Sequence, residues 1–280
     1  MVFKVTKLLS TKLIKSIYLH LICGLIVLSI YSCSSGATPI DNSKHEVNEN
    51  NLNENLGVDN LKYSDSINSL KNKLMGRFDY TKDSDFVLVN SSYCLRPNYM
   101  QKEACLKFIE MSKLAEKSGI SLKVFSGTRN FKEQAEIWNR KWEKFFVKND
   151  SIGTMRTILT YSSMPSTSRH HWGTDIDINC VEGKYFESGK GLKEYNWLCE
   201  NASKFGFCQV YTSKKNSKRT GYEMEKWHWS YLPVANKNLE NFNKLIKYSD
   251  IKGFKGSNLA SKVKSIEDYV NGIDNKCINQ

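Results

Sequence analysis

The 280-residue sequence has few of the residues that mark fibrous or repetitive chains. It contains four prolines and sixteen glycines, which exclude collagen-like and proline-rich architectures. It also lacks the self-similar period that builds solenoids and propellers. Hydrophobic residues make up 40% and charged residues 25% of the chain, so a packed core is expected and wholesale disorder is excluded. The length fits one or two domains.

No Cys-x-x-Cys pair occurs among the eight cysteines, which argues against a zinc ribbon or a redox motif. Six of them follow the N-terminal segment, and an even number permits disulfides in an oxidising compartment. Cys199 with Cys208 and Cys94 with Cys105 are two candidate pairs among the possible ones. Buried free thiols explain these residues equally well.

A hydrophobic run long enough to span a bilayer is also missing. The longest apolar run, residues 17–30, would form a helix of about 21 Å, short of the ~30 Å hydrocarbon core. It follows Lys4, Lys7, Lys12 and Lys15 without an acidic residue, an order typical of a signal peptide. An uncleaved N-terminal anchor is the alternative, and either reading places the remainder outside the cytoplasm.

The end of the apolar run resembles a bacterial lipobox. Residues 28–36 read Leu-Ser-Ile-Tyr-Ser-Cys-Ser-Ser-Gly, and the resemblance implies cleavage before Cys33 and lipid on its sulfur. We therefore expect a signal peptide over residues 1–32. The mature protein is expected to be exported and lipid-anchored to the bacterial cell envelope, at its periplasmic or outer surface.

Residues 33–60 are expected to be a disordered tether. Residues 41–60 contain seven asparagines, five acidic residues and one lysine, and such a polar composition cannot bury enough apolar surface to fold. A linker of this kind lets an anchored domain reach away from a membrane. The remaining residues, 61–280, are expected to form one domain with its core at about 85–250.

The expected domain is strongly basic. The formal net charge of the chain is +12, and the signal and the tether contribute opposite charges of equal size, so the whole excess belongs to the domain. A basic exported domain is attracted to anionic polymers and membrane surfaces, while a solvated Lys-rich surface accounts for the charge without a partner. Export, together with the lack of a recognisable nucleic-acid-binding motif, argues against nucleic acid as a partner.

Apolar periodicity predicts a mixed fold. We expect helices at 101–117, 130–145, 190–204 and 235–248, a short helix near 153–160, and strands at 121–125, 174–178, 207–211 and 227–231. Asn130 with Glu133 is typical of a helix cap. Because helices and strands do not alternate regularly, the expected class is α+β: a compact single domain with a small, largely antiparallel sheet flanked by helices. Residues 61–100 are expected to be an irregular lead-in that wraps the domain.

The histidines indicate a site on this sheet. Three of the five lie beyond residue 45, namely His170, His171 and His228. On the strand at 227–231 the alternating aromatic residues are expected to face the core, so His228 projects from the other face. Asp177 lies on another expected strand, and two imidazoles with a carboxylate are standard zinc ligands. The pattern predicts a zinc site in a cleft on the sheet, although single residues of these types are more often structural.

Three short motifs within residues 120–232 carry a specific resemblance. They are Ser126-Gly127-Thr128-Arg129 followed by Gln134; Ser168, His170, Gly173, Asp175 and Asp177 spaced as Ser-x-His-x-x-Gly-x-Asp-x-Asp; and Glu225-x-x-His228-Trp229. In this order the chain resembles the VanY-type D-alanyl-D-alanine carboxypeptidases, a branch of the zinc peptidases that trim peptidoglycan peptides. With flanking helices the resemblance extends over most of residues 85–250.

The resemblance implies a metal site and a proton carrier. His170, Asp177 and His228 would hold one Zn²⁺ per chain, which lowers the pKa of its bound water toward ~7 and makes hydroxide available at neutral pH. Glu225 would take the proton of that water and later give it to the leaving amine. Because Glu225 precedes His228 by three residues, we expect it in the turn before the strand.

Substrate contacts are implied for three more residues. Arg129 would stabilise the developing oxyanion or bind a substrate carboxylate, since a guanidinium suits both. Ser168 would hydrogen-bond the terminal carboxylate, and Gln134 would contact substrate or lie on the helix surface. The chain departs from the family pattern at Asp175, where a small residue is usual, and at Thr128, where an aromatic residue is usual. The first change is expected to alter metal electrostatics and the second substrate choice.

The expected function is removal of a C-terminal D-amino acid, D-alanine, from peptidoglycan stem peptides by metal-activated water. The expected partners are these peptides and, through the lipid anchor, the membrane. An L,D-carboxypeptidase or a crosslink endopeptidase with the same site is one alternative, because the motifs do not determine which bond is cut. A catalytically inactive wall-binding lipoprotein is another, and the presence of Glu225 argues against it.

Overall fold

The computed structural model describes residues 63–278. In that range no helix is both long and apolar enough to cross a membrane. The expected signal peptide over 1–32, its neighbour Cys33 and the tether over 33–60 lie outside the described residues and stay predictions.

The main sheet of the described domain has four antiparallel strands in the order β3-β4-β6-β5. The strands are β3 (Val124–Ser126), β4 (Asp175–Ile178), β5 (Phe207–Cys208) and β6 (His228–Tyr231). The small, antiparallel sheet expected from the sequence is therefore confirmed, and so is the α+β class.

The pairing register gives this sheet one apolar and one polar face. β4 and β6 place Ile176 opposite Trp229 and Asp177 opposite His228. Successive side chains of a strand point to opposite faces. Ile176 and Trp229 join an apolar cluster with residues of α3 and α6, so Asp177 and His228 project from the other face, as the alternation of aromatic residues predicts.

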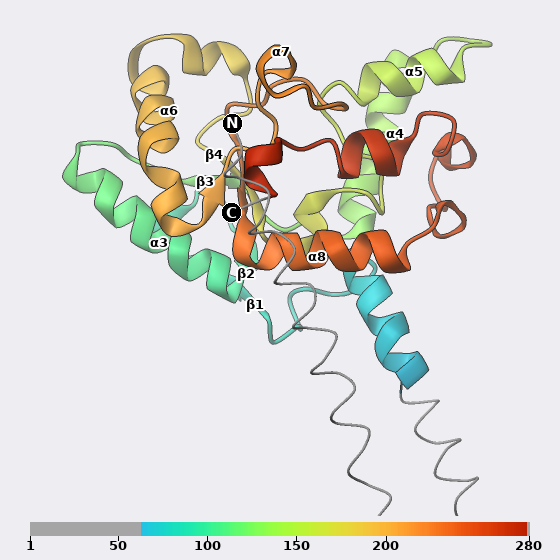
Figure 1. Cartoon of the computed structure of the whole chain (residues 1–280), viewed down its shortest axis with the longest axis horizontal. Coiled ribbons are helices and arrows are strands. Elements are labelled where there is room, and N and C mark those ends of the chain that lie inside the picture. The colour runs from blue at the N-terminus through green and yellow to red at the C-terminus, as the bar shows by residue number, and fades with distance from the viewer. Residues whose placement is uncertain (1–62, 279–280) are drawn as a thin grey trace, which may run out of the picture. The chain divides into compact units, whose positions relative to one another are not determined.

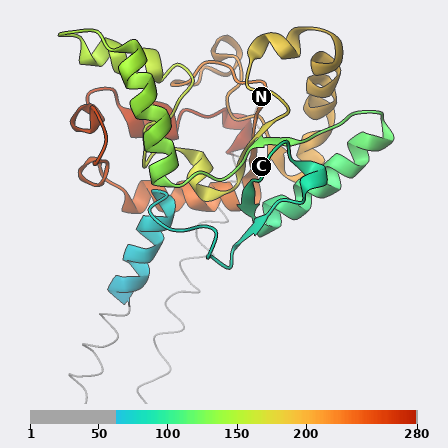
Figure 2. The ribbon, with the colours of Figure 1, turned by 180° about the vertical axis from the view of Figure 1, so that it is seen from behind.

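Helices cover the sheet and build a second apolar cluster. They are α3 (Lys102–Lys117), α4 (Phe131–Phe145), α5 (Ser151–Ile158), α6 (Gly189–Asn201), the single turn α7 (Lys214–Ser217) and α8 (Leu232–Leu245), with a further helix at 63–74. The second cluster lies between α4, α5 and α8. Figures 1 and 2 show α3 and α6 on one side of the sheet and α4 and α5 on the other. Asn130 and Glu133 form the expected cap of α4, as a capping box.

Several expected boundaries are wrong. Residues 61–100 are not an irregular lead-in, because the helix at 63–74 is followed by β1 (Phe86–Leu88) and β2 (Tyr99–Gln101), which pair as a second antiparallel sheet. The strand expected at 207–211 is limited to β5. A strand of two or three residues is too short to show the two-residue period in its sequence. Its length depends on the neighbouring strand with which it pairs.

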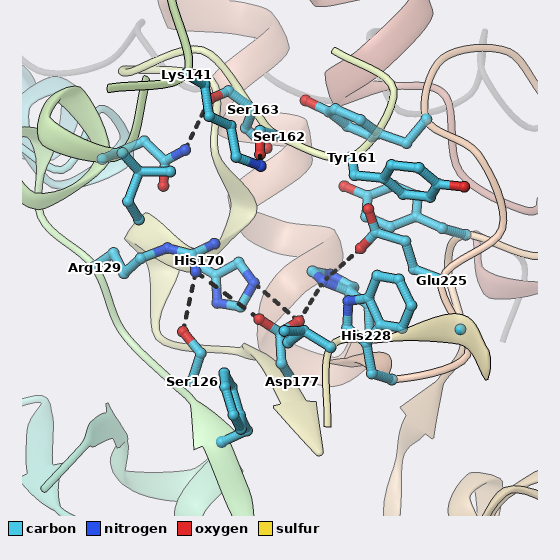
Figure 3. Close-up of a pocket in the computed structure, with 18 of the residues that line it drawn as sticks. Ser126, Arg129, Lys141, Tyr161, Ser162, Ser163, His170, Asp177, Glu225 and His228 are labelled. Atoms are coloured by element: carbon cyan, nitrogen blue, oxygen red, sulfur yellow. Dashed lines mark hydrogen bonds and ion pairs between the residues drawn. The ribbon is translucent and has the colours of Figure 1, made fainter. Parts of the chain in front are cut away.

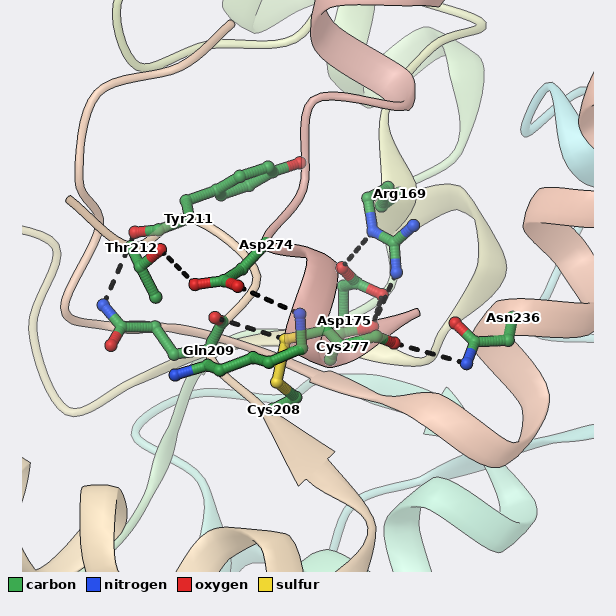
Figure 4. Close-up of a disulfide and its surroundings, with 11 residues drawn as sticks. Arg169, Asp175, Cys208, Gln209, Tyr211, Thr212, Asn236, Asp274 and Cys277 are labelled. Carbon is green, nitrogen blue, oxygen red and sulfur yellow. Dashed lines mark hydrogen bonds and ion pairs between the residues drawn. A yellow bond between two sulfur atoms is a disulfide. The ribbon is translucent and has the colours of Figure 1, made fainter. Parts of the chain in front are cut away.

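The disulfide of the described chain joins Cys208 to Cys277 (Figure 4), so the candidate pairs close in sequence are wrong. Cys94, Cys105 and Cys199 are free thiols. Cys208 lies in the cluster of α4, α5 and α8, whereas α6, which carries Cys199, covers the opposite face of the sheet. The bond spans a sequence separation of 69 residues, and restricting the unfolded chain over such a loop stabilises the fold by roughly 4 kcal/mol.

Candidate metal centre

His170, Asp177 and His228 converge on the polar face of the sheet (Figure 3). Oδ1 of Asp177 lies 3.5 Å from Nε2 of His170 and 3.2 Å from Nδ1 of His228. One potential ligand atom of each residue lies within 4.8 Å of the others. All three side chains are buried, so the structure brings the predicted metal ligands into one group.

In both histidines the ring nitrogen that points away from Asp177 donates a hydrogen bond, and this bond orients the imidazole. Nδ1 of His170 donates to the carbonyl of Gly127 over 2.8 Å, and Nε2 of His228 donates to Oδ2 of Asp175 over 2.9 Å. The remaining ring nitrogens face Oδ1 of Asp177, a buried oxygen without a hydrogen bond from any described group. Two imidazole nitrogens and one carboxylate oxygen form a zinc donor set that leaves a position open. The residues present therefore fit a zinc ion.

A tight turn delivers His170 to this point. Residues Arg169–Trp172 form a 3-10 turn that ends at Gly173, whose φ is 69°. A Cβ at Gly173 would lie 2.4 Å from the Phe86 ring, so both the left-handed backbone and the close packing require glycine. Two residues later β4 begins, and His170 and Asp177 come to face each other.

The protonation states of the histidines and of Asp177 depend on one another. Burial lowers the pKa of His228, but the nearby carboxylates of Asp175 and Asp177 outweigh burial and raise it to about 9. Burial raises the pKa of Asp177, but His170 and His228 outweigh burial and hold it well below its usual range. A proton and a metal ion compete for the same atoms. Metal affinity is therefore expected to fall in acid.

Glu225 lies beside the group, in the turn region before β6 where the sequence places it. Its Oε2 is 3.7 Å from Nδ1 of His228. Its backbone is fixed by a hydrogen bond from its N–H to the Tyr211 carbonyl over 2.9 Å, and by one from Nε2 of Gln209 to its carbonyl over 3.1 Å. Burial, aided by Asp177, raises the pKa of Glu225 to about 8, so this carboxyl group can exchange a proton near neutral pH.

Arg129 lies on the other side of the group from Glu225 (Figure 3). Its Nη1 donates to Oγ of Ser126 over 3.0 Å and lies 3.8 Å from Oδ2 of Asp177. Its Nε is buried without a partner among the described groups. Nδ1 of His171 donates to the Arg129 carbonyl over 2.7 Å, so His171 supports Arg129 and is not part of the metal group. Part of the Arg129 guanidinium is therefore free of hydrogen bonds to the described residues and can bind a ligand.

A cavity of about 640 Å³ opens onto these residues. Its lining includes the cations Arg96, Arg129, Arg140 and Lys141, and the acids Asp177 and Glu225. Tyr161, Tyr211, Tyr222 and Trp227 contribute aromatic walls. The basic lining favours an anionic ligand.

Sequence reasoning missed Lys141. Its Nζ donates to Oγ of Ser162 at the cavity wall. Lys141 follows Gln134 by two helical turns on α4, so the helical period itself carried a signal that both residues share a face. The aromatic residues of the cavity wall give no such signal in the sequence, because they come from separate loops.

The structure places one of two residues predicted to contact substrate, Gln134, at the cavity and the other, Ser168, away from it. Gln134 lines the cavity, although its Nε2 already donates to the Ser163 carbonyl over 2.7 Å. Ser168 is buried and absent from the cavity lining in the described domain, and its Oγ has no partner there. Thr128 donates to the Tyr99 carbonyl over 2.7 Å and borders a smaller cavity beside Arg129. The structure therefore groups Gln134, but not Ser168, with the metal-centre residues.

The fold and the site define an α+β protein with a candidate metal centre of the hydrolase type. Residues 97–234 match the family model VanY, D-alanyl-D-alanine carboxypeptidase, and this part of the chain belongs to that family. The resemblance stated from the motifs is confirmed.

Relatives with curated names share this description. A D-alanyl-D-alanine carboxypeptidase of Enterococcus faecalis is 32% identical over 121 residues, 43% of this chain and 43% of the relative. Another, of Enterococcus faecium, is 27% identical over 201 residues, 71% of this chain and 58% of the relative. The chain thus spans about half the length of these relatives. The solved structure of a mutant of the vancomycin resistance D,D-pentapeptidase VanY in complex with Zn(II) is 27% identical, with a TM-score of 0.42 over 53% of this chain and 83% of its own.

Proposed function

We propose that this protein is a zinc-dependent carboxypeptidase that removes a C-terminal D-amino acid, D-alanine, from peptidoglycan stem peptides. The observation that carries the proposal is the convergence of His170, Asp177 and His228, with Glu225 beside them, on the wall of one cavity. The substrate class comes from the family description and the names of the enterococcal relatives. The basic lining of the cavity supports a substrate with free carboxylates.

The chain's own groups suit peptide hydrolysis. Bound zinc would polarise the carbonyl of the scissile bond and lower the pKa of water at the site. Glu225 accepts the proton of the attacking water, and returns it to the amine that leaves when the carbon–nitrogen bond breaks. Arg129, which lines the cavity, donates hydrogen bonds to the oxygen that becomes negative on the carbonyl carbon.

Defined stem peptides test the proposal. Purified protein with zinc is incubated with tetrapeptide, pentapeptide and crosslinked muropeptides, and the products are weighed by mass spectrometry. We expect the pentapeptide to lose one alanine. Release of D-alanine from the tetrapeptide alone would instead identify an L,D-carboxypeptidase, and opening of crosslinks an endopeptidase. No product from any substrate would leave a binding role for the domain.

We further propose, from the N-terminal sequence, that the protein is exported and lipid-anchored to the cell envelope. Cys33→Ser is expected to abolish incorporation of labelled fatty acid and to slow maturation, because it removes the sulfur that would carry the lipid. Labelling in cells followed by gel electrophoresis measures both effects. Cys23→Ser in the same segment is the matched control and keeps its label. Full labelling of the Cys33 variant would contradict the anchor.

A further inference from the structure

A buried charge pair lies next to the candidate metal centre. Asp175 is 0% and Arg169 1% exposed. Nε of Arg169 donates to Oδ2 of Asp175 over 2.9 Å (Figure 4). Neither residue belongs to the lining of the cavity described above, so the pair does not contact a substrate there. Any effect of the pair on the site must therefore pass through a neighbouring residue.

The carboxylate of Asp175 is held on all sides. Its Oδ1 accepts from the hydroxyls of Ser230 over 2.8 Å and of Thr174 over 2.9 Å. Nη2 of Arg169 donates to Oγ of the same Ser230 over 2.8 Å, which ties the pair to β6. Oδ2 also accepts from Nε2 of His228 over 2.9 Å. Within residues 63–278, His228 is therefore the metal-centre residue that this carboxylate contacts.

We propose that Asp175 is a positioning residue that acts on metal binding through His228; the inference rests on the proposed zinc site. An imidazole that donates its Nε2–H to a carboxylate keeps its lone pair on Nδ1. Nδ1 of His228 lies 3.2 Å from Oδ1 of Asp177, within the group of ligand atoms. Asp175 thus fixes both the orientation of the ring and the tautomer that presents Nδ1 to the ion.

Arg169 makes this second carboxylate compatible with the site. Asp175 and Asp177 project from the same face of β4, and two buried carboxylates without counter-charges would repel each other and resist burial. The guanidinium neutralises Asp175, so the pair orients His228 without adding net charge. Asp175 is the departure from the family pattern that was expected to alter metal electrostatics. The positive charge of Arg169 balances the negative charge that it adds.

Two double variants separate the hydrogen bond from the charge. Arg169→Met with Asp175→Ala removes the charge pair and the acceptor of the His228 hydrogen bond. Arg169→Met with Asp175→Asn removes the same charges but keeps an oxygen that accepts from Nε2. Both keep the three metal-centre residues. Neither leaves one member of the pair buried and unpaired, which would be strongly destabilising.

Zinc affinity and the protonation of His228 are the readouts. The dissociation constant for zinc is measured by competition with a chromophoric chelator, on proteins whose metal-free thermal midpoints are compared. We expect the alanine double variant to bind zinc about 10–100-fold more weakly than the wild type, and the asparagine double variant to recover most of this loss. Long-range ¹H–¹⁵N spectra of the zinc-loaded wild type are expected to show His228 metal-bound at Nδ1 and protonated at Nε2.

The outcomes distinguish this inference from the proposed site. Equal zinc affinity in all three proteins, or a wild-type spectrum with His228 bound through Nε2, would overturn the positioning role and leave the zinc site in place. The wild-type spectrum needs no variant, so the test holds even where a variant does not fold. Failure of the wild type to bind zinc would overturn the site and the inference together.

Discussion

Glu225→Gln is expected to lower kcat for release of D-alanine by about 10²–10⁴-fold, the usual contribution of a positioned proton carrier. The amide is similar in size but cannot accept the proton of the attacking water. Because Glu225 is not one of the three converging ligand residues, the bound zinc should be retained. Steady-state rates and elemental analysis of the same preparation measure both effects.

A carboxylate two residues away provides the matched control. Glu223 forms an ion pair with Lys214 at 2.6 Å and is absent from the cavity lining of the described chain, so Glu223→Gln should keep wild-type rates. Loss of zinc together with activity in Glu225→Gln would mean that Glu225 serves the metal and not the proton transfer.

The pH profile of the wild type belongs to the same test. A base works only when deprotonated, so activity is present above the pKa of Glu225 and is lost as the pH falls through it. Burial raises this pKa to about 8, and a bound cation lowers it, so the loss is expected below pH 8. A rate that stayed constant down to about pH 4, below the usual pKa of glutamate, would contradict Glu225 as the base.

His228→Ala is expected to lose zinc itself, and with it nearly all activity. Zinc sites with four ligands bind with about 10–16 kcal/mol, so one ligand corresponds to roughly a quarter of this and its loss to about 10²–10³-fold weaker binding. Competition titration with a chelator measures the affinity. Wild-type protein stripped of zinc should be equally inactive and should regain activity when zinc returns.

The loss of His228 also removes a partner from two buried carboxylates, so folding needs its own measurement. Circular dichroism of the metal-free variant and wild type provides it. A folded His228→Ala protein that still held one zinc per chain and digested muropeptides normally would refute the proposed centre.

Much of the site follows from local pattern. The alternation of aromatic residues before and after His228 assigns it to the polar face of a strand, and the same period places Asp177 on a shared face with Asp175. Glu225 precedes His228 by three residues, and an ideal strand would place the two side chains on opposite faces. The spacing therefore predicts the turn that is found before β6. These inferences need only the two-residue period of a strand, which any extended segment obeys.

Contacts between distant segments were beyond such reasoning. The sequence offered no reason to join Cys208 to Cys277, and the partner it suggested for Cys208 was Cys199, which lies on the helix that covers the opposite face of the sheet. It also raised Asp175 as an unexplained second acid without indicating that Arg169 neutralises it. Ser168 fits its motif and yet lies away from the cavity lining, because the direction of a side chain in a turn depends on what packs around it.

The sequence by itself determined the α+β class, the candidate metal residues and the family motifs, since each is encoded in spacing along the chain. Only the tertiary structure decided which nitrogen of each histidine faces Asp177, which charges cancel, which walls enclose the cavity and how the cysteines pair. The physical reason is that burial and hydrogen bonding are satisfied by whichever groups packing brings together. Residues adjacent at the site can be separated by more than fifty positions in the chain, as Asp175 and His228 are, 53 positions apart.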